Sequence, residues 1–124
     1  MDDIQIIIEK TKMMKDYLER TKEIYENVRT TGKEHDFYKE VKPFVDEAQQ
    51  FAGEWANLAS HWVDKIRPKY IFSLQIDAAR DNFNEICPQA FYPKTSYSRF
   101  KHHYNSINYI LEKLLSELRN VLEE

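Results

Sequence analysis

The sequence contains little of the material from which β-sheet, disulfide-rich and membrane proteins are built. Only two glycines and four prolines occur in 124 residues, too few for the many turns of an all-β fold. Cys87 is the only cysteine, which excludes an internal disulfide and a cysteine-rich metal site. No apolar run approaches the roughly 20 residues of a membrane span, and the acidic start, MDDIQIII, does not resemble a signal peptide. These absences favour a helical, cytoplasmic protein, for which we predict no cofactor.

Apolar residues recur at helical spacing along the chain. A length of 124 residues and an apolar fraction of 42% suffice for one domain with a buried core. The helical pattern covers four segments, approximately 3–30, 36–66, 69–86 and 96–122. Gly32 is placed to end the first segment, and Thr95 or Ser96 to cap the last. We therefore predict an all-α protein, an antiparallel four-helix bundle with up-down topology that forms a single domain over residues 1–124.

The second and third segments give specific predictions about the core. The apolar side of the second consists of Phe37, Val41, Phe44, Val45, Ala48, Phe51, Ala52, Trp55, Leu58, Ala59, Trp62 and Ile66. Because Phe37 and Val41 keep the phase of the residues after Pro43, we predict one helix with a proline kink. The apolar side of the third segment consists of Ile71, Phe72, Ala78, Ala79, Phe83 and Ile86. Pro88 and Pro93 predict a non-helical connection over residues 87–95.

Three stretches of the sequence carry a resemblance to a known family. They are FYKEVKPFVDEAQ, HWVDKIRPKYI and QAFYPKTSYSRFKHHYNSINYIL. Together they resemble the YppE-like family of small helical proteins from Gram-positive bacteria, over most of the chain. The resemblance implies a compact bundle of four long helices. It implies no assigned activity, so it supplies no catalytic residues.

The sequence shows no pattern typical of a catalytic or metal centre. A di-metal bundle needs paired Glu-x-x-His motifs, but the residues three positions before the four histidines are Gly32, Leu58, Arg99 and Phe100. Asp77, Asp81 and Glu85 form a row at helical spacing that a solvated helix face explains. We therefore predict no catalytic residue, no cofactor-binding residue and no metal ligand.

The stretch CPQAFYPKTSYSRFKHH, residues 87–103, is the strongest candidate for a partner surface. No acidic residue occurs between Glu85 and Glu112, whereas bases and aromatic rings are interleaved there. We expect Phe91, and Tyr92 with it, to fold onto the end of the bundle and cover the core between the third and fourth segments. The candidate surface consists of Tyr92, Lys94, Tyr97, Arg99, Lys101 and His102. It would suit a protein partner or a small anionic ligand, and less well a nucleic acid, because the net charge is −3.

Polar residues within the apolar pattern raise an alternative. Gln75 and Asn82 lie near the centre of the third segment's apolar side, and His103 lies at the edge of the fourth's. A buried amide needs a partner, either an interhelical hydrogen bond or a ligand in a polar pocket near Trp55 and Trp62. The favoured hypothesis is a non-enzymatic interaction module; the alternatives are a small-molecule binder or cryptic enzyme, and a nucleic-acid-binding protein. A homo-oligomer is not predicted, although Met13, Ile24 and Ile110 lie at the margins of the apolar stripes.

Overall fold

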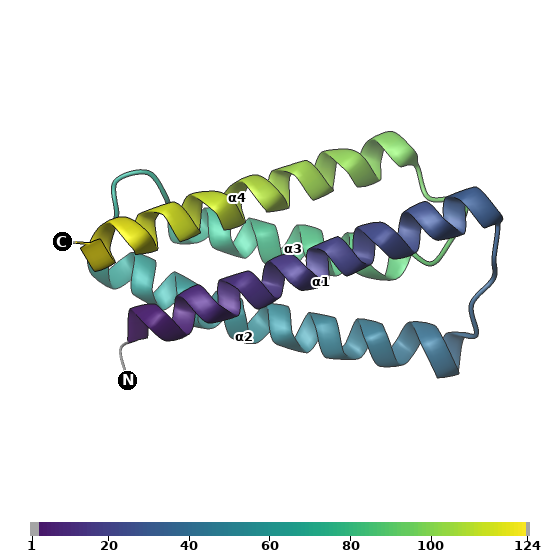
Figure 1. Cartoon of the computed structure of the whole chain (residues 1–124), viewed down its shortest axis with the longest axis horizontal. Coiled ribbons are helices and arrows are strands. Elements are labelled where there is room, and N and C mark those ends of the chain that lie inside the picture. Colours follow the sequence, from purple (N-terminus) through teal and green to yellow (C-terminus); the bar gives the residue numbers. More distant parts are fainter. Residues whose placement is uncertain (1–2, 124) are drawn as a thin grey trace.

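The computed structural model describes residues 3–123 as four antiparallel helices (Figure 1). The elements are α1 (Asp3–Thr31), a π-helical turn η1 (Phe37–Val41), α2 (Lys42–Ile66), α3 (Ser73–Gln89) and α4 (Tyr97–Glu123). Each helix packs against the next in the chain, and α4 packs against α1 to close the bundle. The prediction of an all-α antiparallel bundle with up-down topology is therefore confirmed.

The bundle has two different ends. Asp3, Glu123 and the α2–α3 connection lie together at one end, which we call the terminal end. The α1–α2 and α3–α4 connections lie together at the other, which we call the loop end. Gly32 ends α1 at the loop end with a φ of 68°, as predicted. Ser96 caps α4 there, since its Oγ accepts a hydrogen bond from the backbone N–H of Arg99 at 3.3 Å.

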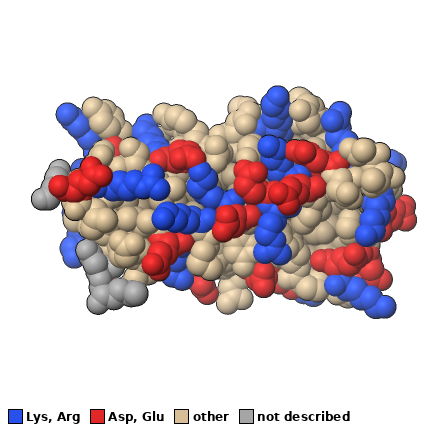
Figure 2. All heavy atoms as spheres, in the orientation of Figure 1, with Lys and Arg blue, Asp and Glu red and all other residues tan. Residues whose placement is uncertain are grey.

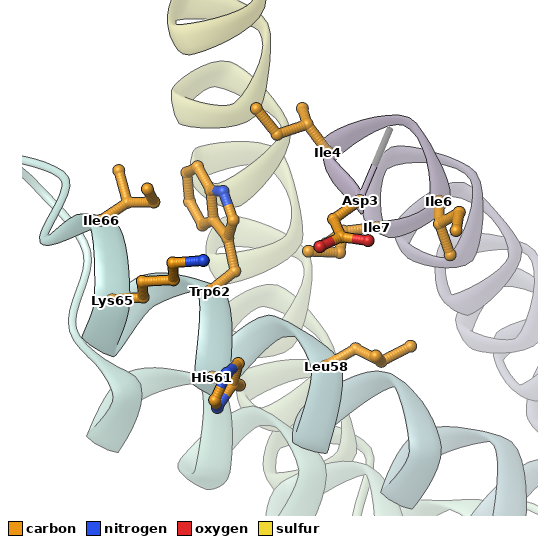
Figure 3. Close-up of a pocket in the computed structure, with 9 residues that line it drawn as sticks. All are labelled: Asp3, Ile4, Ile6, Ile7, Leu58, His61, Trp62, Lys65 and Ile66. Atoms are coloured by element: carbon orange, nitrogen blue, oxygen red, sulfur yellow. The ribbon is translucent and has the colours of Figure 1, made fainter. Parts of the chain in front are cut away.

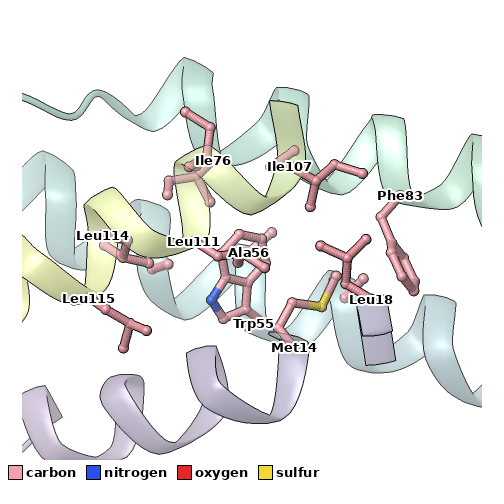
Figure 4. Close-up of a cluster of buried hydrophobic side chains, with 14 of the residues drawn as sticks. Met14, Leu18, Trp55, Ala56, Ile76, Phe83, Ile107, Leu111, Leu114 and Leu115 are labelled. Atoms are coloured by element: carbon pink, nitrogen blue, oxygen red, sulfur yellow. The ribbon is translucent and has the colours of Figure 1, made fainter. Parts of the chain in front are cut away.

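The core is organised around Trp55, which is fully buried. Side chains from all four helices form one buried cluster with it (Figure 4), among them Met14, Leu18, Ala56, Ile76, Phe83, Ile107, Leu111 and Leu114. The indole Nε1 donates a hydrogen bond to Thr11 Oγ1 on α1 at 3.0 Å. Trp62, one turn from the end of α2, is 6% exposed. The inward placement of both tryptophans agrees with the apolar pattern of the sequence.

A π-helical turn, η1, immediately precedes α2, which has Pro43 in its first turn. In η1 the backbone N–H of Val41 donates to the carbonyl of Asp36 at 3.1 Å, and the Asp36 side chain caps the turn by accepting from the N–H of Lys39 at 2.8 Å. A π turn contains more residues than an α turn, so the helical phase changes across it. Val41 remains buried, whereas Phe37 is 50% exposed. The placement of Phe37 in the core was wrong because it assumed a regular α-helix.

Helix α3 begins and ends later than the predicted range of residues 69–86. Phe72 precedes the helix and is 64% exposed, and Ala78 is also exposed. The buried side of α3 instead includes Ile76 and Cys87. With the helix starting at Ser73, the predicted positions of Phe72 and Ala78 in the core were wrong.

The predicted non-helical connection also begins too early, because Pro88 lies inside the last turn of α3. A proline at this position leaves the carbonyl of Asn84 without its usual backbone donor. The side chain of Gln49 on α2 replaces that donor, with Nε2 at 3.0 Å from the Asn84 carbonyl oxygen. Because the freed carbonyl is satisfied by a neighbouring helix, α3 continues through Gln89 and ends close to the loop end.

We predict that Gln49 stabilises the fold through this one hydrogen bond. Gln49→Ala should lower the free energy of unfolding by about 1–2 kcal/mol in urea denaturation, because it leaves a half-buried carbonyl unpaired. In a Pro88→Ala background the residue at position 88 supplies a backbone N–H, so the same substitution should cost measurably less. Gln50→Ala, at the exposed neighbouring position, is the matched control. Equal losses in both backgrounds would contradict the assignment.

Candidate functional site

The two connections at the loop end meet over the end of the core. Phe91, from the α3–α4 connection, is 4% exposed, which confirms its expected role as a cover of the core, whereas Tyr92, expected to cover the core with it, is 50% exposed. Its ring contacts Phe44 of α2, with centroids 5.9 Å apart. It also lies nearly perpendicular to the ring of His35 from the α1–α2 connection, with centroids 5.2 Å apart. This contact brings the two connections side by side and forms the floor of a surface.

Large aromatic side chains stand exposed around this floor. Phe37 and Tyr92 are each 50% exposed, and Tyr38 is 78% exposed. Two adjoining hollows, of about 580 and 390 Å³, both have Phe37 and Tyr92 among their lining residues. Lys94 borders the first hollow and Tyr38 the second. We call the exposed residues Phe37, Tyr38, Tyr92 and Lys94, with the floor beneath them, the loop-end surface.

Two charged residues beside this surface differ in their interactions: Glu40 has two polar partners, whereas Lys94 forms no ion pair among the described residues. Glu40 accepts a hydrogen bond from the backbone N–H of Asp36 at 2.9 Å, and His35 Nδ1 lies 3.4 Å from its other oxygen. The backbone hydrogen bond, with a smaller contribution from His35, lowers the pKa of Glu40. Lys94 forms no ion pair with any residue between 3 and 123. The surface therefore combines exposed rings with a free ammonium group.

The six residues of the sequence-predicted partner surface are not brought together on one face. Tyr92 and Lys94 belong to the loop-end surface. Tyr97 and Lys101 line a groove of about 270 Å³ between α1 and α4, where the Arg29 guanidinium lies 4.1 Å from the centre of the Tyr97 ring. Successive residues of α4 point in directions about 100° apart, so one stretch of sequence is divided among several faces.

The remaining two residues face away from that groove or into solvent. Arg99 pairs with Glu85 of α3, and His102 is exposed with its ring against His103. The stretch without acids in the sequence is thus not free of acids in space, because Glu85 and, at the α1–α4 groove, Glu26 come from other helices. Figure 2 shows acidic and basic side chains alternating over α1 and α4. This face offers no continuous basic track of the kind that nucleic acids require.

The three polar residues predicted for an interior pocket lie at separate places. Gln75 is in the first turn of α3, where its Oε1 accepts a hydrogen bond from the backbone N–H of Phe72 at 2.9 Å. His103 on α4 is mostly buried and its Nε2 lies 3.5 Å from Glu85 Oε2. Asn82 is half-buried on α3 between them in sequence. Gln75 therefore acts at the helix start, and His103 joins the Arg99–Glu85 pair across α3 and α4.

The loop-end surface contains residues that the sequence reasoning did not single out. Tyr38 was not considered, and Phe37 was assigned to the core. The signal that could have found them is Pro43 itself, since a proline near a helix start favours a change of helical geometry before it. An altered phase before Pro43 would have turned Phe37 toward solvent.

The described residues show no grouping suited to metal binding and one thiol with suppressed reactivity. No cluster of three or more potential ligands occurs among residues 3–123. Cys87 is fully buried, and this burial raises the pKa of its thiol to about 12. Within the same range, no helix is sufficiently long and apolar to cross a membrane.

Comparison with known proteins identifies the family. Residues 11–118 match a bacterial domain of unknown function, DUF1798. The chain belongs to the DUF1798 family. The uncharacterized protein YppE of Bacillus subtilis is 31% identical over 114 residues, covering 92% of this chain and 93% of YppE. The YppE-like resemblance seen in the sequence is therefore confirmed.

Solved structures agree with the DUF1798 assignment. A Listeria innocua protein of unknown function superposes with a TM-score of 0.93 at 34% identity, over 98% of both chains. The crystal structure of Bacillus subtilis YppE gives 0.91 at 29% identity, over 97% of this chain and 98% of that one. A DUF1798 protein from Staphylococcus aureus, 20% identical, gives 0.83 over 92% of this chain and 96% of its own, which shows a shared fold. The names of these relatives assign no activity.

We predict that Cys87 is unreactive in the folded protein. Because its pKa of about 12 leaves almost no thiolate near neutral pH, Ellman's reagent at pH 8 should label it only as fast as the protein unfolds. Urea should accelerate labelling sharply. Ser98→Cys in a Cys87→Ala background, which places a thiol at an exposed position, should react at once and serves as the control. Rapid labelling of Cys87 in native buffer would contradict the prediction.

Proposed function

We propose that the protein is a non-enzymatic interaction module that binds a segment of another protein at the loop-end surface. The observation that carries the proposal is the exposure of Phe37, Tyr38 and Tyr92 around two adjoining hollows. Soluble proteins seldom leave large aromatic side chains grouped in solvent without a use for them. Tyrosine and other aromatic residues are also the side chains most enriched at the centres of protein interfaces.

The shape of the surface supports a peptide segment as the bound group. Phe37 and Tyr92 line both hollows, so two apolar side chains of one segment could be held on either side of the same pair of rings. The edge-on contact of Phe37 with Tyr38, with centroids 5.1 Å apart, restrains the ring orientations. Lys94 at the border of the larger hollow supplies a donor for a carbonyl or carboxylate of the segment.

The floor of the surface favours a preformed site. Phe91 is held between Phe44 and His35, and its own burial fixes its position. A partner therefore meets a surface whose lower layer is already packed, which reduces the entropy lost on binding. The area offered by a few side chains suits a weak or transient contact rather than a permanent complex.

We also infer that the protein works in the cytoplasm. Its single cysteine is a free, buried thiol, which is ordinary in a reducing compartment. Fractionation of native cells with an antibody against the protein tests this inference, and recovery in the membrane or secreted fraction would contradict it.

The proposal is tested by cross-linking followed by measurement of affinity. A photoreactive phenylalanine replaces Tyr38 in native cells, and the same group replaces Tyr109, an exposed tyrosine of α4, as the matched control. We expect an adduct from position 38 that does not form from position 109. The partner identified from that adduct is then purified and titrated against the wild-type protein by calorimetry.

Variants of the surface decide whether that partner uses the proposed site. Phe37→Ala and Tyr92→Ala should each weaken binding about tenfold or more, because each removes an aromatic side chain from both hollows. Tyr109→Ala should leave the affinity unchanged. Circular dichroism checks that each variant keeps its helices. An equal yield of adducts from both positions, or an affinity unaffected by Phe37→Ala and Tyr92→Ala, would reject the proposal.

A further inference from the structure

Another pocket lies at the terminal end, far from the loop-end surface. It has a volume of about 330 Å³ and separates the first turns of α1 from the last turns of α2 (Figure 3). From α1 it is lined by Asp3, Ile4, Ile6 and Ile7, and from α2 by Leu58, His61, Trp62, Lys65 and Ile66. We call it the terminal pocket. Its volume is at the lower end of the range of about 300–1,000 Å³ found for ligand pockets.

Among the described residues, the indole N–H of Trp62 has no hydrogen-bond partner. Trp62 is 6% exposed and its Nε1 is buried, yet no acceptor from residues 3–123 reaches it. In Figure 3 the nitrogen is on the edge of the ring that faces α1. Trp55 differs, since its Nε1 donates to Thr11 Oγ1 at 3.0 Å. A buried donor without a partner costs about 1–3 kcal/mol, so an acceptor supplied from outside would be favoured here.

The apolar lining of the pocket is also incompletely covered. Leu58 and Ile66 are in phase with Trp62 on the core-facing side of α2, and the sequence pattern placed both in the core. They are nevertheless 40% and 43% exposed, because the space beside them is open. A small apolar molecule in that space would remove their exposed surface from water, which is favourable in proportion to the area covered.

The charged groups of the pocket select the polar part of such a molecule. Lys65, three residues after Trp62 and therefore on the same side of α2, forms no ion pair with any residue in the described range. Its ammonium group and the indole N–H are both donors, so they favour a group with two acceptor oxygens. Asp3 on the opposite wall is acidic and disfavours a further negative charge.

We propose that the terminal pocket binds a small apolar monocarboxylate. One carboxylate oxygen accepts a hydrogen bond from Trp62 Nε1, the carboxylate pairs with Lys65 Nζ, and the hydrocarbon part covers Leu58 and Ile66. Since Nε1 is closed to water, a side chain at the rim must rotate before the oxygen reaches it; Ile4 lies beside the indole in Figure 3. A dicarboxylate or a phosphate ester would carry a second charge toward Asp3 and bind less well.

Nuclear magnetic resonance distinguishes the two tryptophans directly. The probe is octanoate, titrated below its micelle concentration into uniformly ¹⁵N-labelled protein, with the indole N–H signals assigned from Trp62→Phe and Trp55→Phe. We expect a saturable shift of the Trp62 indole signal and no comparable shift of the Trp55 signal. Octan-1-ol, which lacks the charge, should bind more weakly, and octylamine, which Lys65 repels, should produce no saturable shift.

A charge variant tests the role of Lys65. Lys65→Gln should weaken octanoate binding about tenfold or more, the effect expected when a charged hydrogen bond is lost. Lys69→Gln, a neighbouring lysine outside the pocket lining, should bind octanoate as the wild type does. No saturable shift of the Trp62 signal, equal binding of octylamine, or undiminished binding by Lys65→Gln would overturn the proposal. Because the loop-end surface is not involved, these outcomes are independent of the test of partner binding.

Discussion

The hydrogen bond between Trp55 and Thr11, inside a core drawn from all four helices, is the constraint on which the rest of the structure depends. The indole fills the middle of the bundle, and its one polar atom is satisfied by a side chain of α1. The fully buried alanines on the same helix leave room for so large a ring: Ala48, Ala52, Ala56 and Ala59. This dense packing at the centre of the bundle connects α1 to α2. The open volumes described above therefore lie at the two ends of the bundle and in the groove between α1 and α4.

The sequence predicted the parts of the fold that depend on regular helical spacing. The four helices, the stop at Gly32 and the burial of Trp55 and Phe91 follow from apolar periodicity and from local turn chemistry. One failure arises where a proline is tolerated through a contact distant in sequence. Pro88 continues a helix because Gln49 is 3.0 Å from the Asn84 carbonyl, and no local pattern reveals that pairing of residues 35 positions apart.

The candidate sites were less predictable than the fold because a surface collects residues from several segments. Tyr92 and Lys94 were found from the sequence, but their neighbours Phe37 and Tyr38 come from the other connection, and Phe37 faces solvent only because of the π turn. The absence of acids after Glu85 in the sequence was equally misleading, since Glu85 itself returns to pair with Arg99. The open volume beside Trp62 depends on how far α1 extends along α2, which the composition of either helix does not specify.

The up-down arrangement has a practical result for any protein joined to this one. Because both Asp3 and Glu123 lie at the terminal end, a fusion through either end of the chain, or attachment to a solid support, displays the loop-end surface outward. A fusion at the amino-terminal side would lie next to the terminal pocket, because Asp3 and Ile4 line that pocket. The bundle therefore presents the loop-end surface at the end opposite to either point of attachment.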